Sequence, residues 1–86
     1  MRLDKFLKNS RVIKRRSVAN EACDAGRVTV NGKVAKAGYE VKIGDAVEIR
    51  FGANTTRFTV KALTESPRKE EAPLMYEMEA GSSEID

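Results

Sequence analysis

The chain has 86 residues, with 16 Lys or Arg, 13 Asp or Glu, a net charge of +3, no histidine and one cysteine. This length suits one small domain, and the missing histidine and lone cysteine exclude a zinc site and an internal disulfide. A free thiol is typical of a reducing compartment, and no apolar stretch is long enough for a signal peptide or a membrane span, so we expect a cytoplasmic protein.

The first predicted element is a short helix over residues 2–8. Its apolar residues recur at helical spacing and form one stripe: Leu3, Phe6 and Leu7. Its cations lie on roughly the opposite side: Arg2, Lys5 and Lys8. Residues 11–16 follow as a basic connector, and we expect Val12 and Ile13 to anchor it in the core.

A second helix is predicted over about residues 18–25, with Ser17 as its N-cap and Gly26 ending it in the left-handed conformation. Its apolar residues share one side: Val18, Ala22 and Ala25, flanked by Ala19 and Cys23. Its polar residues occupy the other side: Asn20, Glu21 and Asp24. We interpret Cys23 as a small buried hydrophobe and not as a redox group.

From Arg27 onward apolar and polar residues alternate, which predicts strands. Asn31-Gly32 predicts a hairpin turn, and Gly44-Asp45 predicts a second turn. We expect a strand over 46–51, a loop over 52–56 and a strand at about 57–62, and then a last short strand or helical turn containing Leu74, Met75, Tyr76 and Met78. The predicted class is therefore α+β, with two short N-terminal helices packed on a small, mainly antiparallel sheet and a short irregular C-terminal segment.

Positive charge is concentrated near the N-terminus. Residues 1–36 have a net charge of +7 and residues 37–86 a net charge of −4. Cations gathered by two short elements direct a phosphate backbone to one face of a protein. The candidate RNA-binding residues are seven cations that stand beside a single acid, Asp4: Arg2, Lys5, Lys8, Arg11, Lys14, Arg15 and Arg16. If five of them contact phosphates, the slope of log K against log salt is about −3.5 to −4.5.

The aromatic residues indicate the kind of RNA contact. Phe6, Phe51 and Phe58 fit core positions, so the chain offers no platform on which single-stranded bases would stack. We therefore expect recognition of structured RNA through its backbone and shape.

Other classes of function are less well supported. The absence of histidine and of a base partner for Ser17 or Cys23 argues against an enzyme, and we expect no catalytic residue, cofactor or metal site. The alternatives are a solvated basic surface, a membrane-surface helix and a helix-turn-helix DNA-binding protein. The last is disfavoured because the outer face of the second helix carries Glu21 and Asp24.

Five segments in order resemble the RNA-binding domain named after ribosomal protein S4: RLDKFL at 2–7, SR at 10–11, KRRS at 14–17, AGRVTVNGKVAK at 25–36 and VKIGDAVEIRF at 41–51. Their order and spacing make the match specific over residues 1–62. Within that group the chain is similar to the RqcP (YabO) family, including RKEEAPLMYE at 68–77. The resemblance implies an S4-like domain over 1–62 built on an αL-type RNA-binding motif, with a charged segment over 63–79 packing on it. The last residues, 80–86, match nothing in the family, and we expect them to form a disordered tail.

The resemblance also implies a function. RqcP-like proteins bind large ribosomal subunits obstructed by peptidyl-tRNA, contact an rRNA helix of the intersubunit face, and support RqcH in the alanine tailing of stalled chains. By position, Arg2 and Arg16 match the family's most prominent RNA-contacting arginines, with Arg11, Lys14 and Arg15 in the same motif. The implied protein is a ribosome-associated monomer in the cytoplasm.

Three alternatives to this function remain. Heat-shock ribosome-recycling proteins carry a related domain but usually have a longer basic C-terminal extension, whereas residues 62–86 of this chain have a net charge of −5, which favours RqcP. A general ribosome-recycling or assembly factor would need no stalled chain. An RNA-modifying enzyme subunit would need a separate catalytic partner chain.

Overall fold

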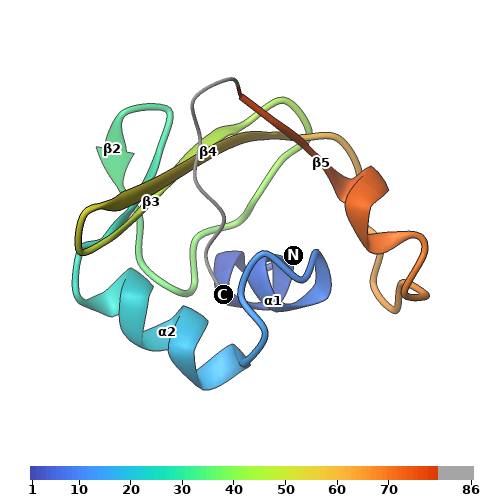
Figure 1. Ribbon diagram of the computed structural model, residues 1–86, viewed down its shortest axis with the longest axis horizontal. Coiled ribbons are helices and arrows are strands. Elements are labelled where there is room, and N and C mark those ends of the chain that lie inside the picture. Colours follow the sequence, from blue (N-terminus) through green and yellow to red (C-terminus); the bar gives the residue numbers. More distant parts are fainter. Residues whose placement is uncertain (80–86) are drawn as a thin grey trace.

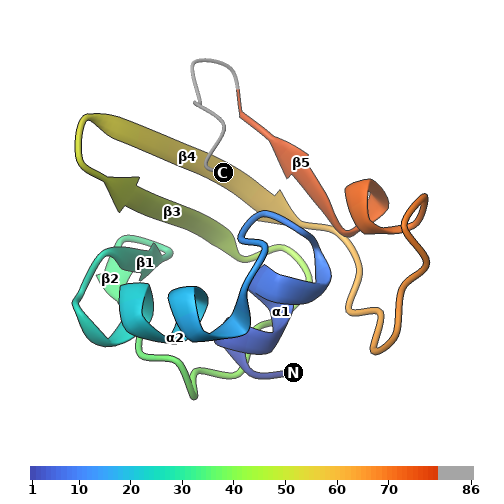
Figure 2. The ribbon, with the colours of Figure 1, turned by 60° about the horizontal axis from the view of Figure 1, so that its bottom comes forward.

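The computed structural model describes residues 1–79, in which two α-helices cover one face of a five-stranded sheet (Figures 1 and 2). The helices are α1 (Leu3–Asn9) and α2 (Arg16–Asp24). The strands are β1 (Val28–Val30), β2 (Lys33–Val34), β3 (Ala46–Phe51), β4 (Asn54–Val60) and β5 (Tyr76–Met78), and a 3-10 turn, η1 (Ala72–Met75), precedes β5. The strand order is β2-β1-β3-β4-β5 with every pair antiparallel, which confirms the predicted α+β class.

The core lies between the helices and the sheet. Leu3, Phe6 and Leu7 of α1 are fully buried. The rings of Phe6 and Phe58 stack with their centroids 6.0 Å apart, which joins α1 to β4. Val12 and Ile13 are also buried, so they anchor the connector as predicted. Because the apolar stripe of α1 faces the sheet, its lysines are directed away from it.

Residues with positive φ end α2 and form the turn after β1, both at the positions that the sequence predicts. After α2, Gly26 adopts φ 77°, and the N–H groups of Gly26 and Arg27 donate to the carbonyls of Cys23 and Ala22. This is a Schellman ending, which satisfies carbonyls that the helix leaves unpaired. Between β1 and β2, Asn31 (φ 52°) and Gly32 (φ 85°) form the predicted two-residue turn.

The predicted loop over 52–56 is wrong. Phe51 pairs with Asn54, so only Gly52 and Ala53 form the turn, and β4 begins at Asn54. Gly52 adopts φ 55°, which lets two residues reverse the chain. The run of polar residues hides this strand in the sequence, yet Thr56 is fully buried opposite Ile49.

The start of α2 also differs from the prediction. The helix begins at Arg16, the extended Arg15 is its N-cap residue, and no side chain caps it. Ser17 therefore lies inside the first turn, where its hydroxyl cannot take the capping position. With Val12 and Ile13 buried, the chain enters the helix two residues earlier than the serine indicates.

The buried side of α2 is rotated from the expected one. Ala19, Ala22 and Cys23 are buried, whereas Val18 and Ala25 are exposed. The buried three follow an i, i+3, i+4 spacing, so they form a narrow stripe of small side chains against which α1 can approach closely. The interpretation of Cys23 as a buried hydrophobe is confirmed.

Both predicted forms of the last apolar stretch occur, since η1 is a helical turn and β5 is a strand. Met75 is fully buried, but Leu74 is 71% exposed because neighbouring residues of a tight turn face different directions. The expected tail over 80–86 lies outside the described residues. None of the helices in residues 1–79 is long and apolar enough to cross a membrane.

Candidate nucleic-acid interface

The seven candidate cations come from the N-cap residue of α1, from α1 itself, from the connector and from the first residue of α2. Six of them have exposed side chains: Arg2, Lys8, Arg11, Lys14, Arg15 and Arg16. The seventh, Lys5, is half-buried, and its Nζ lies 2.6 Å from Glu65 Oε1. The two helices and the connector thus gather six exposed cations.

A buried carboxylate joins Arg2 to Arg16. Arg2 donates from Nε and Nη2 to the two oxygens of Asp4, at 3.2 and 3.4 Å. Arg16 Nε lies 3.5 Å from Asp4 Oδ2. The amide of Asn20 and the backbone N–H of Lys5 also donate to this carboxylate, at 3.2 and 2.8 Å. Asp4 therefore holds Arg2, the N-cap residue of α1, beside Arg16, the first residue of α2.

The ionised state of Asp4 sustains this arrangement. Burial raises the pKa of the carboxyl, but the hydrogen bonds from Asn20 and the Lys5 N–H and the charge of Arg16 outweigh it, so the net pKa lies below its ordinary value. Arg2 and Arg16 each keep about half of their side-chain surface exposed (51%). Their remaining N–H groups can donate to phosphate oxygens, for which the guanidinium fork is well suited.

The backbone of Arg2 is fixed by the segment that precedes β3. The N–H of Leu3 donates to the carbonyl of Tyr39 at 2.8 Å, and Arg2 forms a bridge with Glu40. The N–H of Val41 donates to the carbonyl of Met1 at 2.9 Å. Arg2 is thus held at its backbone by this segment and at its side chain by Asp4.

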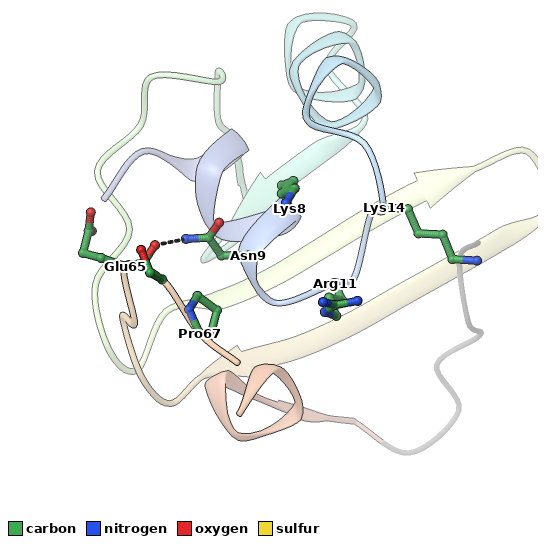
Figure 3. Close-up of a pocket in the computed structure, with 7 residues that line it drawn as sticks. Lys8, Asn9, Arg11, Lys14, Glu65 and Pro67 are labelled. Atoms are coloured by element: carbon green, nitrogen blue, oxygen red, sulfur yellow. Dashed lines mark hydrogen bonds between the residues drawn. The ribbon is translucent and has the colours of Figure 1, made fainter. Parts of the chain in front are cut away.

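The opposite end of α1 borders an open groove of about 560 Å³ (Figure 3). It is lined by seven residues: Lys8, Asn9, Arg11, Lys14, Glu65, Ser66 and Pro67. The Asn9 amide donates to the carbonyls of Thr64 and Glu65, at 3.3 and 2.9 Å, and so ties the chain after β4 to the end of α1. Residues far apart in the sequence therefore form the two walls.

The outer face of the sheet is different in character. Glu48 accepts from Arg50 at 2.8 Å and from Arg57 at 3.1 Å, and Lys61 is ion-paired with Glu77 at 3.2 Å. The hydrogen bonds from the two arginines lower the pKa of Glu48, so it is ionised at neutral pH. Positive and negative charges alternate on this face, whereas the helical side gathers cations.

Three further cations of the N-terminal half, Arg27, Lys33 and Lys36, lie outside this cluster of seven. Arg27 lies 6.0 Å from the centre of the Phe51 ring, in cation–π range. Lys36 Nζ donates to the carbonyl of Asp24 at 3.2 Å, and Lys33 lies exposed on β2.

Two further observations concern groups that could bind a metal or react as a thiol. Among residues 1–79, no three His, Cys, Asp or Glu side chains come together in a way that would hold a metal ion. Burial, with the nearby charges of Asp4 and Asp24, raises the pKa of Cys23 to about 11, so its thiol is protonated at neutral pH.

Sequence reasoning missed Asp4 and Asn20 as parts of this surface. Asp4 stood out only as the single acid among seven bases, and Asn20 was assigned to the outer face of the second helix. A signal for Asp4 is present, because it lies one residue after Leu3 and three before Leu7, at the edge of the buried stripe. Nothing local identifies Asn20, whose amide reaches Asp4 across the two helices.

Comparison with known proteins gives consistent matches. Residues 1–47 match the model of the S4 domain. A protein of Halalkalibacterium halodurans described as an RQC P-site tRNA stabilizing factor is 56% identical over 78 residues, which cover 91% of this chain and 89% of that protein. A Bacillus subtilis protein of the same description is 51% identical over 76 residues, covering 88% of each chain. The trimeric structure of heat shock protein 15 from Vibrio cholerae superposes with a TM-score of 0.85 at 32% identity, over 95% of this chain and 84% of that one.

Proposed function

This chain belongs to the S4-domain family that includes the RQC P-site tRNA stabilizing factors, and from that premise we propose that it is a non-enzymatic RNA-binding factor of ribosome-associated quality control. Its targets are rRNA and tRNA on large ribosomal subunits obstructed by peptidyl-tRNA. There it supports the alanine tailing of stalled chains together with RqcH. It acts as a monomer in the cytoplasm, through the S4-like domain of residues 1–62, on which the charged segment of residues 63–79 packs.

The observation that carries this proposal is the pair of arginines on Asp4. Arg2, which precedes α1, and Arg16, which begins α2, share one buried carboxylate, so both are held before any RNA arrives. A binding surface whose side chains are already ordered loses less conformational entropy on binding. The other proposed contacts are the remaining five cations: Lys5, Lys8, Arg11, Lys14 and Arg15.

Two features favour structured RNA over the other nucleic acids: the burial of two aromatic rings argues against single strands, and the acids of α2 argue against duplex DNA. Phe6 and Phe58 are fully buried, so they offer no surface for base stacking. Glu21 and Asp24 are exposed on α2, and these acids would repel the backbone if α2 entered a DNA groove.

The test is co-sedimentation of the tagged protein with purified large subunits, with and without bound peptidyl-tRNA. We expect enrichment on the peptidyl-tRNA particle. Arg2→Ala/Arg16→Ala should bind about 10- to 100-fold more weakly, since each lost arginine removes a charge-assisted contact of about 1 kcal/mol or more. The control is Arg50→Gln, which also removes the positive charge of an exposed arginine. Arg50 lies on the outer face of the sheet, away from the helices. Unchanged binding by a folded double variant would refute the site assignment.

A second candidate is a general factor of ribosome recycling or assembly that needs no stalled chain. The fold likeness to heat shock protein 15 favours it. Equal binding to particles with and without peptidyl-tRNA would support this candidate and contradict the quality-control proposal. Binding of duplex DNA in competition with rRNA would instead favour the helix-turn-helix alternative.

A further inference from the structure

Arg11 has a backbone conformation that arginine rarely adopts. It follows Ser10, the C-cap of α1, and its φ is 62°, in the left-handed region. Its N–H donates to the carbonyl of Lys8 at 3.0 Å, as a residue just beyond a helix end commonly does. This position usually holds glycine, because a side chain there is strained.

The other helix of this chain follows the usual rule. The corresponding residue after α2 is Gly26, with φ 77°. The two helix ends thus use similar backbone geometry with opposite residue choices. Glycine would adopt this backbone conformation at the end of α1 with less strain than arginine. The reason for an arginine at this position must therefore lie in its side chain.

That side chain lines the groove between the end of α1 and residues 65–67 (Figure 3). Within residues 1–79, neither Arg11 nor Lys8 has an acidic partner. The acid on the groove wall, Glu65, is bound instead by Lys5 at 2.6 Å, which also lowers the pKa of this carboxyl. The groove therefore holds positive charge from Lys8 and Arg11 that the described residues do not neutralise.

The chemistry of the lining indicates what the groove binds. The guanidinium and ammonium groups only donate hydrogen bonds, and Ser66 is a further polar residue of the lining. Pro67 is the single apolar side chain of the lining, so the groove has no flat apolar floor for a base. This combination suits the phosphate and sugar of a nucleic-acid backbone.

The groove is separate from the arginine pair on Asp4. That pair lies at the start of α1, whereas the groove lies beyond its end. A seven-residue helix is about 10 Å long, so one phosphate cannot contact both. Resting on the proposed function, we propose that the groove is a second phosphate-binding site for the RNA backbone, with Arg11 as its main contact.

The test compares binding with stability in Arg11→Gly. Glycine fits the left-handed position, so the melting temperature should stay the same or rise by a few degrees. Binding to large subunits with peptidyl-tRNA should weaken about fivefold or more, and the slope of log K against log salt should become shallower by about 0.7 to 0.9. Arg11→Lys, which keeps the charge, should retain most of the binding. Arg50→Gln is again the control.

The outcomes separate this proposal from the function on which it rests. If Arg11→Gly binds like the wild type while Arg2→Ala/Arg16→Ala binds weakly, the groove proposal is overturned and the proposed function stands. Weaker binding with a lower melting temperature would also overturn it, because the loss would then follow from folding. A wild-type protein that binds no large subunits would overturn both.

Discussion

The substitution Asp4→Asn tests whether the buried carboxylate prepares the arginine pair for RNA. Asparagine has nearly the shape of aspartate, and its oxygen can still accept from the Lys5 N–H or from Asn20. It has no charge to hold Arg16, and its NH₂ group would face the donors of Arg2. The change thus removes the link between the two arginines and leaves the surrounding packing in place.

The expected loss of stability follows from these contacts. A hydrogen bond to a charged group contributes about 1.5 to 3 kcal/mol, and the half-exposed arginines put this case near the lower end. We expect Asp4→Asn to lower the free energy of unfolding by about 1.5 to 2 kcal/mol. In a domain of this size this lowers the melting temperature by roughly 6 to 16 °C.

Two effects on RNA binding oppose one another. Removing an acid near a phosphate, at about 8 Å in water, strengthens binding by roughly 0.5 kcal/mol. Against this, the two released arginines must be ordered again on binding, at about 0.5 to 1.5 kcal/mol each. The ordering term is larger, so we expect binding that is weaker by about two- to seventyfold.

The measurement is binding to large subunits carrying peptidyl-tRNA, at a temperature where all variants are folded by circular dichroism. The matched control is Glu21→Gln, which removes an exposed acid of α2 with the same change of charge. We expect the control to bind as well as the wild type or slightly better. If Asp4→Asn binds as tightly as this control, the carboxylate does not prepare the arginines and the reasoning is refuted.

Two further predictions concern stability. The lowered pKa of Asp4 stabilises the fold at pH values above its unfolded pKa near 3.8, and this contribution is lost as the pH falls through the lower folded value. The stability gap between the wild type and Asp4→Asn should therefore be full at pH 7 and shrink below about pH 4 in urea titrations; a gap that is constant with pH would contradict it. Gly32→Ala should destabilise the fold by about 1 kcal/mol because φ is 85° there, although no atom lies within 4 Å of the new Cβ. Gly38→Ala should be nearly neutral, because φ is not positive at that position and the space is equally open. Thermal melts of both variants measure the difference. Equal effects at the two glycines would show that backbone conformation is not the cause.

Local patterns in the sequence were enough to predict most elements of the fold. The stripe of Leu3, Phe6 and Leu7 predicted α1, and Asn31-Gly32 predicted the first hairpin, because helix period and turn chemistry involve only near neighbours. The seven cations of residues 2–16 were predicted to form one basic cluster because they, too, are near neighbours in the sequence. The polar start of β4 was missed, since burial of Thr56 depends on the strand opposite it.

The tertiary structure alone decided how that cluster is divided. The sequence places all seven cations within fifteen residues but does not reveal that Asp4 links Arg2 to Arg16, because that contact needs the packing of α1 against α2. It does not reveal the groove either, since Asn9 meets the carbonyl of Glu65 across 56 positions of the chain. Charge is a property of composition, which the sequence determines. The distances between charges depend on long-range packing, which only the folded chain determines.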